Sequence, residues 1–250
     1  MNGSQRPTVK DMNFGFTLVE MAMVLFIVTL LMAGLVPTIT SQTEQQRTND
    51  TRKQMSEIKE ALNGYTIRYG ALPCPARGLT PTGQSYSGVA AGVADCTLGE
   101  WGVLPWVTLG TSETDGWGNR FTYRVTSYFT DSIASATYGA SCTPSPAPTQ
   151  ASFALCSVGN LTVKSAASGT DVAVNIPAVI ISHGKNGAGA YTQKGTLRPV
   201  GSSTDEVENN THFSNTYYVS HVQTPSFDDL VEWITPNILY NRMVTAGKLP

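Results

Sequence analysis

Glu20 is the side chain whose surroundings most call for a chemical explanation. It lies in an apolar run that begins at Phe16, and between residues 21 and 36 only Thr29 is neither apolar nor glycine. A carboxylate among hydrocarbon side chains is costly, and such a residue usually marks a function with a specific partner. The alternative is that the Glu20 side chain extends to a nearby water interface.

A free amine on Phe16 would be a suitable partner for the Glu20 carboxylate. Cutting the chain after Gly15 would create that amine, four residues before Glu20. Within one chain the pairing is awkward to reach. Between neighbouring subunits displaced along a filament axis it is natural.

Ser182 and His183 are the residues that would suit catalysis, within the glycine-rich run of residues 182–187. The run lacks the spacing of a phosphate-binding P-loop. Adjacent residues at a strand end point in opposite directions, so His183 is poorly placed to act as a base for Ser182. We expect a tight turn after a core strand, and no enzyme activity.

The acidic stretch of residues 205–210 offers hard oxygen ligands. Asp205, Glu206 and Glu208 would be the ligands of a calcium ion, the cation that such oxygens favour. The spacing of an EF-hand is absent. The alternative is a solvated acidic loop without a metal.

Four cysteines, Cys74, Cys96, Cys142 and Cys156, are widely spaced and form no C-x-x-C pair. An even number of spread cysteines is typical of disulfides in an oxidising compartment, although four free buried thiols are the alternative. Three pairings are open. We favour Cys74–Cys96 with Cys142–Cys156 because this pairing closes the shortest loops.

The composition bounds the class of protein. Of 250 residues 14% are charged, and the chain contains 23 glycines and 14 prolines. This mixture is typical of a loop-rich domain outside the cytoplasm. The formal net charge of −2 gives no basic surplus, so we expect no nucleic-acid partner.

One long helix must position Glu20. Residues 16–40 are long and apolar enough to predict a transmembrane helix. Arg6 and Lys10 would keep the amino-terminal end of this helix on the cytoplasmic side of the membrane. Residues 41–70 predict its amphipathic continuation. The stripe there has helical spacing and consists of Met55, Ile58, Leu62, Tyr65 and Tyr69.

Residues 71–250 predict a globular domain of α+β class, in which the helix packs on a mostly antiparallel sheet. Residues 70–119 predict a long loop region. Expected strands are residues 120–125, 152–158, 161–164, 172–182, 217–222 and 228–234, and a short helix is expected near residues 236–244.

The run Gly15-Phe16-Thr17-Leu18-Val19-Glu20 matches a prepilin cleavage signature, and the chain resembles type IV pilins and type II secretion pseudopilins. The resemblance implies cleavage after Gly15 by prepilin peptidase, methylation of the Phe16 amine, and a role for Glu20 in subunit registration. One departure is Phe14, where a basic residue would be usual. Pro37 falls where many pilins carry a helix-kinking proline. Major pseudopilins also carry calcium in a loop equivalent to residues 205–210.

The expected protein is therefore a filament subunit. Residues 1–15 would be the leader, residues 16–40 the membrane and filament-core helix, and residues 71–250 a periplasmic domain with two disulfide-braced loops. Its partners would be prepilin peptidase, the inner membrane and other pilin subunits, and the assembled filament would be extracellular. A binding module at the filament tip is the main alternative, and a membrane-anchored enzyme is a weaker one.

Overall fold

The computed structural model describes residues 15–92, 96, 99–210 and 216–250, without the side chains of residues 33–39. The chain divides into two units, Met1–Gln46 and Arg47–Pro250. We describe each unit by itself. The N-terminal unit holds the first part of helix α1, and the globular unit holds the rest of α1 and all the other elements.

Helix α1 spans Leu18–Tyr69, which confirms the predicted long helix. In residues 18–32 the large apolar side chains are exposed on every face of the helix. Among the residues that the structure describes, no helix combines the length and the hydrophobicity that crossing a membrane requires. The predicted bend at Pro37 falls on residues 33–39, whose side chains lie outside the description.

Within the globular unit, the second part of α1 packs on the central sheet through residues of the predicted stripe. Met55, Ile58 and Leu62 are fully buried. The last turn departs from the prediction, because Thr66 is buried while Tyr69 is exposed. Thr66 can be buried without loss because its hydroxyl donates a 2.8 Å hydrogen bond to the Leu62 carbonyl.

A four-stranded antiparallel sheet forms the centre of the globular unit, in the order β1-β2-β5-β7. Tyr123 of β2 lies opposite Ile180 of β5, and Ile181 of β5 lies opposite Val231 of β7. The strands are β1 (Trp101–Val103), β2 (Thr122–Val125), β5 (Ala178–Ser182) and β7 (Leu230–Trp233).

A second sheet has the order β4-β3-β6, with β3 antiparallel to β4 and parallel to β6. Its strands are β3 (Leu161–Lys164), β4 (Asp171–Ile176) and β6 (Tyr217–Val219). The remaining elements are α2 (Trp106–Leu109), α3 (Thr204–Asn210), α4 (Pro236–Thr245) and 3-10 turns at Ser127–Phe129 and Ile133–Ser135.

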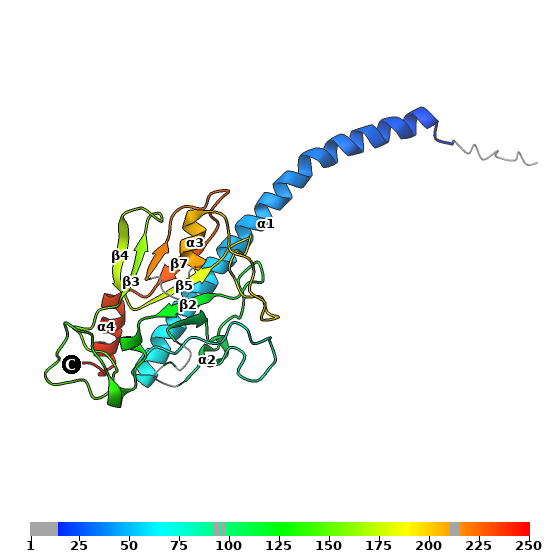
Figure 1. Ribbon diagram of the computed structural model, residues 1–250. Helices are drawn as coiled ribbons and strands as arrows, with labels where there is room; N and C mark the ends of the chain where they lie inside the picture. Colours follow the sequence, from blue (N-terminus) through cyan, green and yellow to red (C-terminus); the bar gives the residue numbers. More distant parts are fainter. Residues whose placement is uncertain (1–14, 93–95, 97–98, 211–215) are drawn as a thin grey trace, which may run out of the picture. The chain divides into compact units, whose positions relative to one another are not determined.

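Strand β5 lies between β2 and β7 in the central sheet (Figure 1), and its two faces belong to two hydrophobic cores. Ala178 and Ile180 join the α1 side chains and α4 in one buried cluster. Val179 and Ile181 join the second sheet in another. Because alternate side chains of a strand point to opposite faces, helices cover one face of the central sheet and the second sheet covers the other.

Two sequence predictions in this region were wrong. Residues 172–182 are not one central strand, because the extended backbone is interrupted at Pro177. Two residues earlier, Asn175 has a φ of 60°. Proline supplies no backbone donor, so the two halves enter different sheets as β4 and β5. Residues 152–158 form no strand.

Two disulfides join Cys74 to Cys96 and Cys142 to Cys156, which is the predicted pairing. Their Cα atoms lie 5.3 and 5.2 Å apart. Each bridge closes a segment that has little regular structure, where few backbone ladders exist to hold the chain. The bridges therefore restrict the conformations of these loops in the unfolded chain as well.

Replacing Leu62 by alanine should destabilise the globular unit. The change leaves a cavity in the α1–sheet core, and we expect the free energy of unfolding to fall by about 2–5 kcal/mol. Leu79→Ala is the matched control because Leu79 is 70% exposed. Denaturant unfolding measures both variants. Equal stability of the two would contradict the packing of α1 on the sheet.

Candidate functional site

The first candidate site is the beginning of α1. Gly15, Phe16 and Thr17 precede the helix in non-helical, exposed backbone. The Thr17 backbone N–H and hydroxyl each donate a 3.0 Å hydrogen bond to Glu20 Oε2, and the Glu20 N–H donates a 3.2 Å bond to Thr17 Oγ1. Glu20 therefore caps its own helix.

This reciprocal arrangement is a capping box, which was not among the predicted features. The signal was present, since threonine three residues before glutamate at a helix start is its signature. The predicted cleavage position, between Gly15 and Phe16, lies among described residues. The leader residues Arg6, Lys10 and Phe14 lie outside them.

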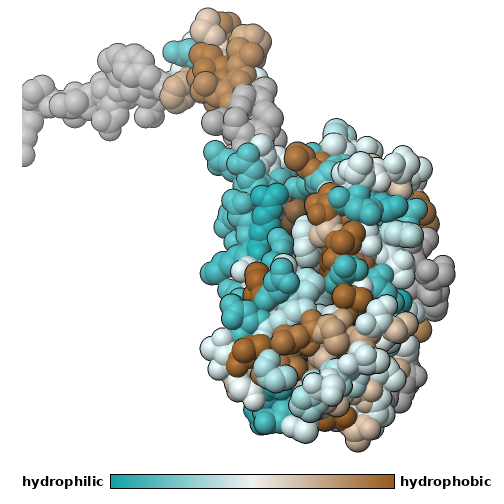
Figure 2. Space-filling view, turned by 90° about the vertical axis from the view of Figure 1, so that its left-hand side faces the viewer, coloured by the Kyte–Doolittle hydropathy of each residue, from teal (hydrophilic) through white to brown (hydrophobic). Residues whose placement is uncertain are grey.

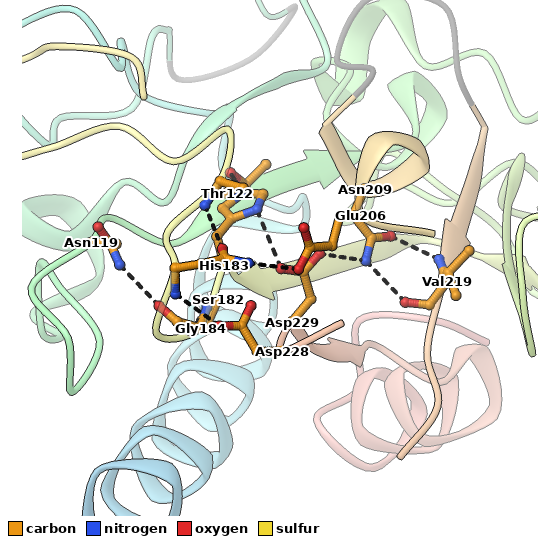
Figure 3. Close-up of polar contacts among 12 residues, drawn as sticks. Asn119, Thr122, Ser182, His183, Gly184, Glu206, Asn209, Val219, Asp228 and Asp229 are labelled. Atoms are coloured by element: carbon orange, nitrogen blue, oxygen red, sulfur yellow. Dashed lines mark hydrogen bonds and ion pairs between the residues drawn. The ribbon is translucent and has the colours of Figure 1, made fainter. Parts of the chain in front are cut away.

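The second candidate site is a group of buried polar side chains around the end of β5 (Figure 3). The turn of residues 115–119 holds one side of it. Asp115 Oδ1 accepts 2.9 Å hydrogen bonds from the N–H groups of Trp117 and Asn119, and Asp115 Oδ2 accepts a 2.6 Å bond from the Ser182 hydroxyl. Asn119 Nδ2 donates to the Gly184 carbonyl.

His183 points away from Ser182, as predicted. Its Nε2 lies 2.8 Å from Thr122 Oγ1, and its Nδ1 lies 3.8 Å from Asp229 Oδ1. Both Ser182 and His183 are fully buried. Both side chains are closed to solvent, and their polar partners include Asp115 for Ser182 and Thr122 and Asp229 for His183, an arrangement typical of a buried turn.

Three carboxyl groups converge beside His183. One oxygen each from Glu206, Asp228 and Asp229 lies within 4.8 Å of the others. Helix α3 contributes Glu206, and the two aspartates come directly before β7. Figure 3 shows the three side chains turned toward one another.

Amide groups orient these carboxyl groups. Asn186 donates from its backbone N–H to Asp228 Oδ2 at 2.8 Å and from Nδ2 to Glu206 Oε1 at 2.7 Å. Asn209 Nδ2 donates to Asp229 Oδ2 at 2.8 Å. Among the described residues, the buried atoms Asp228 Oδ1, Asp229 Oδ1 and Asn210 Oδ1 accept no hydrogen bond.

Burial and mutual repulsion disfavour the ionised forms of Asp228 and Asp229. Burial raises the pKa of Asp229 well above its usual range, and the neighbouring Glu206 and Asp228 raise it further, against the hydrogen bond from Asn209. Burial, and then Glu206, also raise the pKa of Asp228. A divalent cation would offset this repulsion and keep the carboxylates ionised.

The residues fit calcium in their chemistry. Three carboxylates, two of which have a buried oxygen that accepts no hydrogen bond among the described residues, are the hard donors that calcium takes. A cavity of about 630 Å³, lined by Asn186, Gly201, Ser203 and Glu206 among others, lies beside the group. A calcium ion bound by Glu206, Asp228 and Asp229 would link α3 to the residues before β7.

The predicted ligand set is corrected by the structure. The acidic stretch forms helix α3 instead of a loop. Of the predicted ligands, only Glu206 belongs to the cluster of three carboxylates with Asp228 and Asp229. Asp205 accepts from the Ala167 N–H at 2.7 Å and lies 3.1 Å from His221 Nε2. Glu208 lies outside the group because successive helix residues point in different directions.

Asp228 and Asp229 were not among the predicted ligands, because the sequence signal for a metal was a local run of acidic residues, 205–210. The fold instead joins Glu206 to two carboxylates about twenty residues further along the chain, so no local spacing could identify the set.

Comparison with known proteins gives no relative. No family model matches the chain, and no curated protein and no solved structure matches it.

Millimolar calcium should raise the melting temperature of the protein at pH 7. Saturation at about 100 times the dissociation constant would add about 2.7 kcal/mol to the free energy of unfolding. Asp229→Asn should abolish the increase, while Asp171→Asn, an exposed control outside the group, should keep it. Acidification should also reduce it, because protons compete for the carboxylates. A calcium effect unchanged in Asp229→Asn would exclude this site.

Proposed function

We propose that the chain is a prepilin-type structural subunit, a minor pilin or pseudopilin. Prepilin peptidase would cleave it after Gly15, the new Phe16 amine would be methylated, and α1 would anchor it in the bacterial inner membrane. Residues 71–250 would lie in the periplasm until the subunit enters a type IV pilus-like or type II secretion filament. The alternative of a membrane-anchored enzyme has no support from the buried Ser182 and His183.

The observation that carries the proposal is the apolar, unpartnered surface of α1 over residues 18–32. Large hydrophobic side chains are exposed there on all sides of the helix. A helix that is apolar all round requires lipid or other helices around it. Membrane insertion and filament packing would supply these two surroundings in turn.

The side chains of Thr29 in this segment and of Thr17 just before it form hydrogen bonds close by in the same chain. The Thr29 hydroxyl donates a 2.8 Å hydrogen bond to the Phe26 carbonyl. Thr17 provides both donors that bind Glu20. A polar group that is bonded within its own helix enters an apolar environment at much lower cost than an unbonded one.

Glu20 retains one oxygen for a partner. Both Thr17 donors bind Oε2, and among the described residues no hydrogen bond reaches Oε1. The amine of Phe16 from a neighbouring subunit would be a charge-assisted donor to that oxygen. The capping box would thus hold the carboxylate at the helix start, where a neighbour displaced along the filament could meet it.

The cleavage step requires an accessible peptide bond. Gly15 and Phe16 are exposed and precede the first helical residue. Apart from the glycine itself and its two chain neighbours, no heavy atom of the described residues lies within 4 Å of the position of a Cβ at Gly15. A peptidase can bind such a segment without first unwinding the helix.

Glu20→Gln tests the pairing apart from the capping. Glutamine can still accept the Thr17 hydrogen bonds, so α1 should begin at the same residue, but it lacks the charge that attracts an amine. We expect intact membrane insertion and loss of filament incorporation, measured by fractionation and immunoblotting of sheared filaments.

Glu57→Gln is the matched control, because Glu57 is an exposed glutamate in the same helix. It should assemble normally. Normal incorporation of Glu20→Gln would reject the pairing mechanism.

The processing step predicts a specific mass. Protein purified from peptidase-competent cells should lack residues 1–15 and carry one additional methyl group on Phe16, as intact mass and amino-terminal sequencing would show. Gly15→Val should leave the chain uncut, because the side chain blocks the peptidase. A mature protein that starts at Met1 or downstream of Phe16 would contradict this step.

A further inference from the structure

Strand β4 is an exposed edge of the second sheet. It pairs with β3 on one side, and β3 is the only strand paired with it in the described part of the chain. Val172 and Val174 are 52% and 49% exposed, and only Ile176 of the strand is buried. An exposed apolar edge is a template for another strand.

Two other strand edges in the globular unit, those of β6 and β1, are covered. Asn209 covers the edge of β6, donating from Nδ2 to the Val219 carbonyl and accepting from the Val219 N–H. Ala76 covers the edge of β1 by exchanging two backbone hydrogen bonds with Val103. The fold protects these two edges and leaves β4 open.

A groove of about 440 Å³ runs beside β4, between this strand, residues 155–158 and the start of α4. Figure 2, which views the side of the globular unit where β4 and α4 lie, shows hydrophobic side chains gathered on this face. The groove walls include Leu155, Val158, Val174, Trp233 and Tyr240.

The groove is held in shape without a ligand. The Tyr240 hydroxyl donates to the Ser157 carbonyl, which ties α4 to residues 155–158. The Cys142–Cys156 disulfide fixes the same segment. A preformed groove costs little conformational entropy on binding.

We propose that β4 and this groove bind an extended, uncharged segment of another protein by strand addition. The segment's main chain would pair with the open edge of β4, and its apolar side chains at alternate positions would enter the groove. Main-chain hydrogen bonds then give affinity, and side-chain pockets give specificity. This binding does not depend on filament assembly.

The lack of charged residues in the groove and its small size favour a single uncharged segment as the ligand. None of the twelve residues lining the groove is Asp, Glu, Lys or Arg, so a charged segment would lose its hydration without gaining an ion pair. A stable interface between two copies takes about 20–30 residues a side. The six residues of β4 and this groove are fewer and match a single strand of about 20 Å.

The test uses the full chain in detergent and the acetylated, amidated peptide Ser-Val-Thr-Val-Ser-Val-Thr as the probe. We expect a Kd below about 1 mM by NMR titration. Binding should protect the Val172 or Val174 amide from hydrogen exchange and shift the Trp233 indole signal. The same peptide with proline in place of its central valine should bind more weakly, because proline removes a main-chain donor.

Val174→Lys should weaken peptide binding by about tenfold or more, because a charge on an edge strand opposes pairing. Val222→Lys is the matched control, since Val222 is 85% exposed and does not line the groove. Circular dichroism should show both variants folded, because Val174 is about half exposed and Val222 is 85% exposed. Failure of the probe to bind, equal binding by both variants, or self-association that Val174→Lys removes would each overturn the proposal.

Discussion

The packing of Met55, Ile58 and Leu62 against the central sheet is the interaction on which the globular unit depends. These side chains join β2, β5 and α4 in one buried cluster. A single helix therefore has two different requirements along its length. Its second part is covered on one face by its own chain, whereas residues 18–32 expose hydrophobic side chains in every direction. The proposed filament role follows from the part that the chain itself does not cover.

Strand β5 connects this packing to the polar group. Because both of its faces are buried, the strand delivers Ser182 and His183 into a region closed to solvent. There the available partners are fixed dipoles and carboxyl groups instead of water. The turn that follows Ser182 and His183 holds Asn186 against the carboxyl groups of Glu206 and Asp228.

The division of the strands between two sheets determines the outer surface. Helix α3 has two roles. Its Glu206 lies against the carboxylates of Asp228 and Asp229, and its Asn209 covers the edge of β6. Strand β4 has no such cover, and it lies next to the aromatic walls provided by Trp233 and Tyr240. One loop-rich domain thus combines a buried polar group with an exposed strand edge at β4. For these two regions we propose different ligands, a cation and an uncharged peptide.

The sequence by itself determined the features that depend on nearby residues. Helical spacing identified α1 and most of its buried stripe, and the short separations of the cysteines identified both disulfides. Only the tertiary structure showed that the strand is interrupted at Pro177, so that β4 and β5 belong to different sheets. It alone brought Glu206 to Asp228 and Asp229. Such groupings depend on packing between distant segments, which leaves no periodic pattern in the chain.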